Sequence, residues 1–181
     1  MRGWWLGVLL GLAAPVWALE SAWVSWVMDG DTVLLVPEGE AVPLKWRLSG
    51  LDAPEICQAG GEAARDALIA RVLRRTVRIE ALAEDVYGRQ LGRLWLDGQD
   101  VGAQMVRTGM AWAWQHRSGR GPYAALQRQA QRQRVGVFAA REAPMSPALF
   151  RQFHGSCHGD EDKLTGAPVQ RVPQTGQAGS R

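Results

Sequence analysis

Five short apolar runs, rich in residues that favour β-strands, divide the first half of the chain. They cover residues 23–28, 32–36, 42–48, 77–82 and 92–96. Asp29-Gly30-Asp31 joins the first two runs, and an Asp-Gly turn between such runs is a strong hairpin signal. The pattern therefore predicts a sheet that begins with a β-hairpin.

Three further stretches have helical features. Apolar positions repeat at helical spacing over residues 62–74, Asp100 is placed to cap a short helix ending at Arg107, and Gly121-Pro122 opens a helix over about 123–134. One helix follows the third strand and the others follow the fifth. This order predicts an α+β fold, a five-stranded OB-fold barrel plus three α-helices.

With 181 residues, 46% of them hydrophobic, the chain can bury one sizeable core. We expect one folded domain over residues 19–145 and a C-terminal extension over 146–158. Residues 159–181 are polar and rich in Gly, Pro and Gln, which predicts a disordered tail.

The N-terminus has the order of a secretory signal peptide. Arg2 precedes an apolar stretch over residues 4–14, and Val16-Trp17-Ala18 supplies small residues at a cleavage site. Cleavage is expected after Ala18. The alternative is an uncleaved membrane anchor, but the run is shorter than the roughly 20 residues of a spanning helix. We expect a periplasmic or secreted protein that does not contact the membrane after cleavage.

Two cysteines, Cys57 and Cys157, remain after that cleavage. In an oxidising compartment they either form a disulfide or stay as two thiols. A disulfide would close a loop of about 100 residues and contribute about 4–5 kcal/mol on the chain-entropy model. It would tie the C-terminal extension to the loop that follows Glu55.

Three polar clusters lie at the ends of the predicted strands: residues 29–32, 47–55 and 85–89. A barrel can bring them together, which would place three or four carboxylates beside two arginines. That combination suits a hard divalent cation with a phosphate, and so points to phosphodiester cleavage. The net charge of +3, supplied almost entirely by arginine, mildly favours an anionic partner.

Asp31 and Asp52 are the best candidates for metal ligands, because calcium prefers carboxylate, carbonyl and water oxygens. Asp29 is near enough in sequence to act as an outer-shell partner. Taken alone, Asp29 and Asp31 are better explained as ordinary hairpin-turn residues. The metal prediction therefore depends on the combination of clusters.

Arg47 and Arg89 together are candidates to clamp an anionic group, although each alone is better explained as an exposed surface arginine. Glu55, which follows Pro54, is a candidate general base able to take a proton from water.

The ordered set of motifs resembles the staphylococcal nuclease (thermonuclease) family over about residues 23–138. The matching motifs are Asp-Gly-Asp-Thr, Arg-Leu-x-Gly-Leu-Asp-Ala-Pro-Glu, Asp-x-Tyr-Gly-Arg, and a later Asp-Gly followed by Val-x-x-Gly-Met-Ala. The resemblance implies an OB-fold barrel with three helices. It also implies a calcium-dependent nuclease that acts on DNA and RNA and leaves 3′-phosphate ends.

The resemblance also implies a role for each site residue, with one calcium ion per site. The implied metal ligands are Asp31, Asp52 and the backbone carbonyl of Ala53; the catalytic set is Arg47, Glu55 and Arg89; Tyr87 contacts phosphate or nucleotide; and Asp29 is an outer-shell group. We expect a monomer with no stable protein partner. The alternative function is a nucleic-acid-binding OB-fold module without hydrolysis, and a third is an exported metal-binding or interaction domain. The joint presence of Arg47, Glu55 and Arg89 favours the enzyme.

Overall fold

The computed structural model describes residues 20–86, 89–114, 121–140, 145–155 and 157. The predicted signal peptide, Tyr87 and the predicted tail lie outside these ranges, so those predictions stay predictions. Across the described ranges, no helix is both long enough and apolar enough to cross a membrane.

The predicted five-stranded barrel is confirmed. Antiparallel pairing gives the strand order β3-β2-β1-β5-β6, and parallel pairing of β3 with β6 closes the sheet. The barrel strands are β1 (Glu20–Val27), β2 (Thr32–Pro37), β3 (Leu44–Leu48), β5 (Thr76–Glu84) and β6 (Gln90–Leu96). There are also two-residue strands: β7 (Gln99–Asp100) pairs antiparallel with the end of β6, and β4 (Leu51–Asp52) pairs with β8 (Trp112–Ala113).

The three predicted helices are present; the ends of the first and third are shifted by one or two residues, and the second has the predicted ends. They are α1 (Gly61–Val72), α2 (Val101–Arg107) and α3 (Ala124–Gln133), and a short 3₁₀ helix covers Gly136–Ala139. Asp100 caps α2 as predicted, since its Oδ1 accepts a hydrogen bond from the Ala103 N–H at 3.1 Å.

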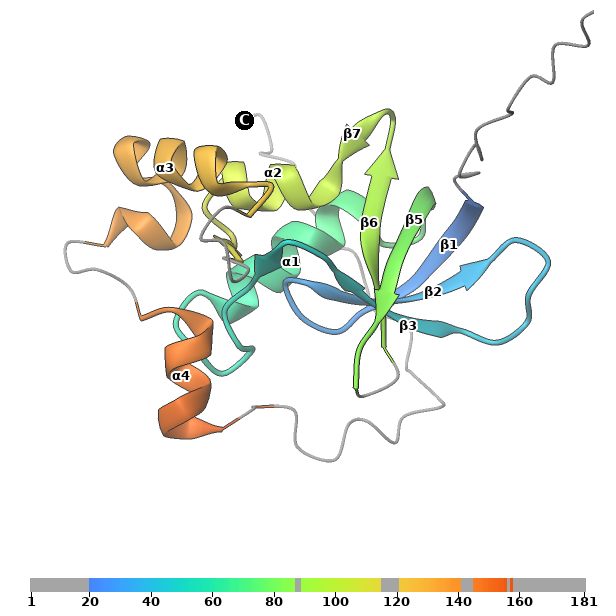
Figure 1. Ribbon diagram of the computed structural model, residues 1–181, viewed down its shortest axis with the longest axis horizontal. Helices are drawn as coiled ribbons and strands as arrows, with labels where there is room; N and C mark the ends of the chain where they lie inside the picture. The colour runs from blue at the N-terminus through green and yellow to red at the C-terminus, as the bar shows by residue number, and fades with distance from the viewer. Residues whose placement is uncertain (1–19, 87–88, 115–120, 141–144, 156, 158–181) are drawn as a thin grey trace, which may run out of the picture.

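The predicted number of helices was wrong, because the C-terminal extension forms a fourth helix, α4 (Pro147–His154). Ser146 caps it through a hydrogen bond from the Leu149 N–H, and Pro147 occupies the first turn. Both are ordinary helix-start residues. Figure 1 shows α4 beside the chain that leads into α1, on the side of the barrel where the other helices lie.

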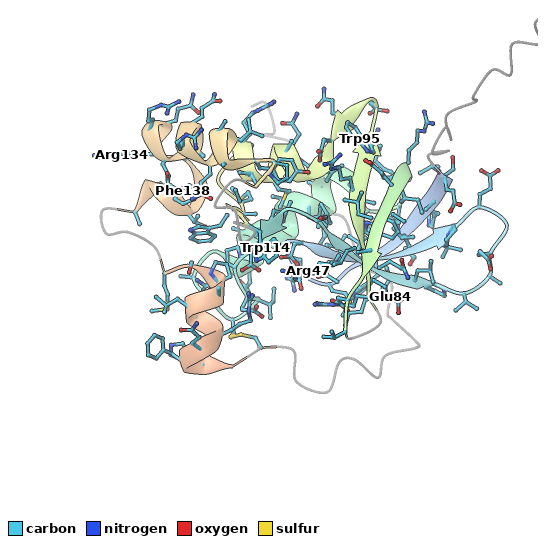
Figure 2. The ribbon with its side chains drawn as sticks, in the orientation of Figure 1. Arg47, Glu84, Trp95, Trp114, Arg134 and Phe138 are labelled. Atoms are coloured by element: carbon cyan, nitrogen blue, oxygen red, sulfur yellow. A yellow bond between two sulfur atoms is a disulfide. The ribbon has the colours of Figure 1, made fainter. Side chains whose placement is uncertain are left out.

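The core fills the barrel and continues beneath α1 and α2. Its large, almost fully buried side chains include Trp46, Leu48, Leu68, Leu94 and Met105. No residue of α4 belongs to this core. Arg47 and Trp114 lie where the barrel gives way to the helices (Figure 2).

Candidate active site

The β1–β2 hairpin turn delivers Asp31 to the end of β3. Thr32 pairs with Arg47 in the β2–β3 ladder, and the Leu48 N–H donates to the Asp31 carbonyl at 2.8 Å. Gly30 allows this approach, since a Cβ there would lie 2.7 Å from the Cβ atoms of Ala53 and Ala64. Any larger residue at position 30 would push the hairpin away from the segment that carries Asp52.

Arg47 joins two of the predicted clusters. Its guanidinium donates to Asp31 Oδ1 at 2.7 Å and to Asp52 Oδ1 at 2.8 Å. The two aspartates are buried, whereas the Arg47 side chain is 19% exposed. The structure therefore places Asp31 and Asp52, the predicted metal ligands, on either side of one guanidinium group.

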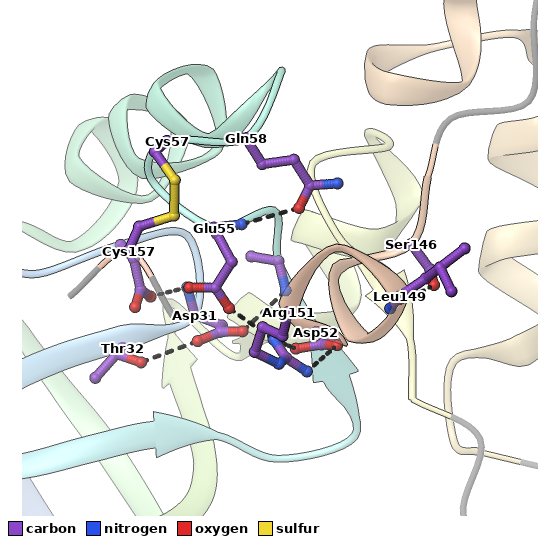
Figure 3. A network of polar contacts seen from close by, with 12 residues as sticks. Asp31, Thr32, Asp52, Glu55, Cys57, Gln58, Ser146, Leu149, Arg151 and Cys157 are labelled. Atoms are coloured by element: carbon purple, nitrogen blue, oxygen red, sulfur yellow. Dashed lines mark hydrogen bonds and ion pairs between the residues drawn. A yellow bond between two sulfur atoms is a disulfide. The ribbon is translucent and has the colours of Figure 1, made fainter. Parts of the chain in front are cut away.

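Backbone and hydroxyl groups fix the Asp31 carboxylate from the other directions. Its Oδ2 accepts from the Ala53 N–H at 2.8 Å, and its Oδ1 accepts from the Thr32 hydroxyl at 2.9 Å (Figure 3). The Asp29 side chain, which is also buried, accepts a hydrogen bond from the Asp31 N–H at 2.8 Å. Asp29 thus stands behind Asp31, the place predicted for an outer-shell group.

Burial raises the pKa of the Asp31 carboxyl to about 7; Arg47 opposes this rise, and the nearby Asp29 carboxylate adds to it. Burial also lowers the pKa of Arg47, but the charges of Asp31 and Asp52 outweigh that effect and raise it. The charge of the Asp31 carboxyl therefore changes near neutral pH.

Glu55 is buried close to Asp52, and a tight turn sets its position. The Glu55 N–H donates to the Gln58 side-chain oxygen at 3.2 Å, and the Gln58 N–H donates to the Glu55 carbonyl at 2.8 Å. At the start of α1, a Cβ at Gly61 would overlap the Glu55 carbonyl oxygen. Sequence reasoning did not identify Gln58 or Gly61, whose importance comes from local geometry.

Sequence reasoning also missed Arg151 of α4. Its Nη1 donates to Glu55 Oε1 at 2.7 Å and to Asp52 Oδ1 at 3.1 Å, and its Nη2 donates to Asp52 Oδ2 at 2.9 Å. Figure 3 shows this side chain pointing from α4 into the carboxylate group. The C-terminal extension thus supplies a second arginine, beside Arg47, that contacts the carboxylates of the site.

Two contacts on either side of Arg151 attach the extension to the loop after Glu55. Cys57 and Cys157 form a disulfide with a Cα–Cα distance of 5.9 Å, within the usual range. Before α4, the Gln58 side-chain amide donates to the Met145 carbonyl at 2.8 Å. A signal for Arg151 did exist in the sequence, because the predicted disulfide already placed residues near 157 beside Glu55.

Arg89 has described contacts with Asp85: its Nε donates to Asp85 Oδ2 at 2.7 Å and its backbone N–H to Asp85 Oδ1 at 3.0 Å. Leu91, two residues further on, pairs with Arg47. Arg89 is therefore close to the Arg47 end of the barrel, but none of its described contacts is with Asp31, Asp52 or Glu55. Its predicted role in phosphate binding stays a prediction.

The donor chemistry of the site fits a hard divalent cation. Calcium takes about six to eight oxygen ligands, and Asp31 and Asp52 offer carboxylate oxygens. Among the described residues, no three acidic, histidine or cysteine side chains gather as a preformed metal site. Instead, the guanidinium groups of Arg47 and Arg151 contact the carboxylates. A cation at Asp52 would have to replace some of these contacts.

Comparisons with known proteins found one matching family and several similar sequences. A protein-family model described as staphylococcal nuclease homologue matches residues 45–140. Protein ParB of Escherichia coli is 36% identical over 142 residues, covering 72% of this chain and 79% of that protein. An uncharacterized endonuclease of Haemophilus influenzae is 32% identical over 126 residues, 70% of each chain. A micrococcal nuclease of Shigella flexneri is 33% identical over 144 residues, 73% of this chain and 81% of its own.

Proposed function

The chain belongs to the staphylococcal nuclease family, and from this premise we propose that it is an exported, calcium-dependent nuclease that hydrolyses phosphodiester bonds of DNA and RNA. The observation that carries the proposal is the convergence of Asp31, Asp52, Glu55 and Arg47 from separate segments of the chain. Relatives named nuclease or endonuclease, such as the Shigella flexneri protein, support the same reaction.

Each residue then has a chemical role. Asp31 and Asp52, with the Ala53 carbonyl, would hold calcium, and bound calcium supplies a Lewis acid for a phosphoryl oxygen. Glu55 accepts a proton from the attacking water. Arg47 and Arg89 stabilise the negative charge that gathers on the phosphate; a guanidinium group holds its proton at every physiological pH, so both are poor proton donors.

Bonds and protons balance along this route. The water oxygen forms a bond to phosphorus, the bond to the 5′-oxygen breaks, and the phosphate stays on the 3′-oxygen. Glu55 takes the water proton, and the leaving 5′-oxygen gains a proton from solvent. Export is proposed from the N-terminal sequence; the first strand begins at Glu20, directly after the proposed cleavage site. We propose that the mature protein is monomeric.

A cleavage assay tests the proposal. The mature protein is incubated with single- and double-stranded DNA and RNA, in calcium or in chelator, and the ends of the products are analysed. We expect calcium-dependent cleavage with 3′-phosphate ends. Glu55→Gln should lose about 10²–10⁴-fold in rate, the usual contribution of a general base.

A control variant makes this assay specific. Glu80→Gln removes a carboxylate whose described partner is Arg93, on the barrel surface, and should cleave like the wild type. Equal rates for Glu55→Gln and Glu80→Gln would refute the role of Glu55. Binding without calcium-dependent cleavage in the wild type would instead support the non-hydrolytic module.

A further inference from the structure

We propose that Arg151 occupies the cation-binding carboxylates in the cation-free protein, and that a divalent cation binds by displacing Arg151 and helix α4. The inference rests on the cation site of the proposed function and adds a competitor supplied by the chain itself. The stretch matched by the family model ends at residue 140, before α4 begins.

The first support is the geometry of Arg151. Both of its terminal nitrogens contact Asp52, one on each carboxylate oxygen, and Nη1 also contacts Glu55. A paired guanidinium–carboxylate contact of this kind uses the oxygen lone pairs that a metal ion would need. Asp52 cannot keep both hydrogen bonds to Arg151 and also coordinate a cation through the same lone pairs. Arg151 and the cation are therefore competitors.

The second support is that α4 is weakly packed. Pro147 is its one buried residue, while Leu149 is 41% exposed and Phe153 is 69% exposed. The Arg151 side chain is itself 34% exposed. Little apolar surface therefore returns to water when α4 leaves, so its displacement costs little hydrophobic free energy.

The third support is the disulfide. Cys157 lies three residues beyond the end of α4, and its partner Cys57 lies two residues beyond Glu55. A tether this short keeps Arg151 at a high effective concentration near Asp52 and Glu55. The same tether holds a displaced α4 close to the site, so Arg151 returns when the cation leaves. The disulfide thus makes the competition intramolecular.

Calcium binding to the cation-free protein, without nucleic acid, tests the competition directly. Calorimetric titration with calcium should give Arg151→Gln a dissociation constant about tenfold lower than that of the wild type, the ratio that corresponds to about 1.4 kcal/mol of lost competition. Arg151→Lys should fall between the two, because lysine cannot form the paired contact. Arg132→Gln, which removes an exposed arginine from α3, is the control and should match the wild type.

Unchanged or weaker calcium binding by Arg151→Gln would overturn the proposal. Weaker DNA binding with unchanged calcium binding would assign Arg151 to the substrate phosphate instead and also overturn it. Calcium binding by both proteins without any cleavage would refute the nuclease while leaving the competition testable by affinity. If neither protein binds calcium, the competition and the calcium-dependent function both fail.

Hydrogen–deuterium exchange gives a second measurement that does not depend on activity. An isolated helix of eight residues is unstable in water, so displaced α4 should lose its protection. Calcium should therefore speed exchange at the amides of Phe150 and Gly155, whose hydrogen bonds lie within or at the end of α4. Slower or unchanged exchange there in saturating calcium would overturn the proposal.

Removing the tether tests the role of the disulfide. The double substitution Cys57→Ser/Cys157→Ser should raise calcium affinity, and adding Arg151→Gln should then give a smaller gain than it gives in the wild type. Equal gains in the two backgrounds would show that the disulfide does not act through Arg151. The single Arg151 variants keep the proposal testable if the double variant folds poorly.

Discussion

Arg47 bridges two buried carboxylates, so replacing it by glutamine should destabilise the cation-free protein strongly. Asp31 is 2% exposed and Asp52 is 4% exposed. Removing one partner of a buried ion pair costs about 3–5 kcal/mol. Asp52 keeps Arg151, and Asp31 keeps the Thr32 hydroxyl and the Ala53 N–H. Because these contacts remain, we expect the Arg47→Gln loss at pH 8 to lie at or just below the lower limit of that range, about 2–3 kcal/mol.

Urea unfolding in chelator at pH 8 and pH 5 measures this loss. At pH 5 the Asp31 carboxyl, with its pKa raised to about 7, is protonated, so the variant buries one unpaired charge fewer. The loss should therefore shrink by about 1 kcal/mol at pH 5. Arg75→Gln, which breaks an exposed 3.0 Å ion pair with Asp97, is the control and should cost less than about 1 kcal/mol. Similar losses for both variants, or a loss at pH 5 as large as at pH 8, would refute the reasoning.

Three further perturbations test the scaffold around the site. The folded-state pKa of Asp31, about 7, is higher than its ordinary value of 3.8. Protonation of Asp31 therefore stabilises the folded protein fully below about pH 4, and this stabilisation is lost as the pH rises through 7. Urea unfolding should show this loss in the cation-free wild type and not in Asp31→Asn. Gly61→Ala should displace the Glu55 carbonyl. We expect thermal melting to show a loss of about 1–3 kcal/mol in the free energy of unfolding, and the nuclease assay to show a lower cleavage rate. An unchanged cleavage rate would contradict this prediction. Asp100→Ala removes the α2 cap and the 2.8 Å hydrogen bond from the Tyr123 hydroxyl. Thermal unfolding should therefore show that the free energy of unfolding falls by about 1–3 kcal/mol. A fall no larger than that caused by an exposed surface substitution would contradict this prediction.

The barrel was predictable because its determinants are local. The strand runs, the Asp-Gly turn and the Asp100 cap each act within a few residues, and all appear in the structure. The three clusters were correctly expected at strand ends, and closure of β3 onto β6 sets their mutual arrangement. Ser146-Pro147 was a comparable local signal for α4 that was not used, which explains the wrong helix count.

Arg89 and Arg151 show where prediction from sequence stops. A motif fixes the place of Arg89 in the chain, but not the partners of its side chain, which in the structure include Asp85. Arg151 meets Asp52 across 99 residues of chain. No periodicity or turn rule reports a contact at that separation, and the cysteine pair was the one feature that pointed to it.

The charge of the site indicates that Arg151 in its present position would not attract a nucleic acid. Four buried carboxylates, those of Asp29, Asp31, Asp52 and Glu55, are set against the two guanidinium groups of Arg47 and Arg151. When all are ionised the group is negative, and it would repel a phosphodiester at short range. The donors of Arg151 already contact carboxylates, so in this arrangement they do not face a phosphate. Exchanging that single positive charge for a divalent cation makes the group less negative and frees Glu55 to accept a proton. Cation entry and Arg151 departure would then both have to precede productive binding of a phosphodiester.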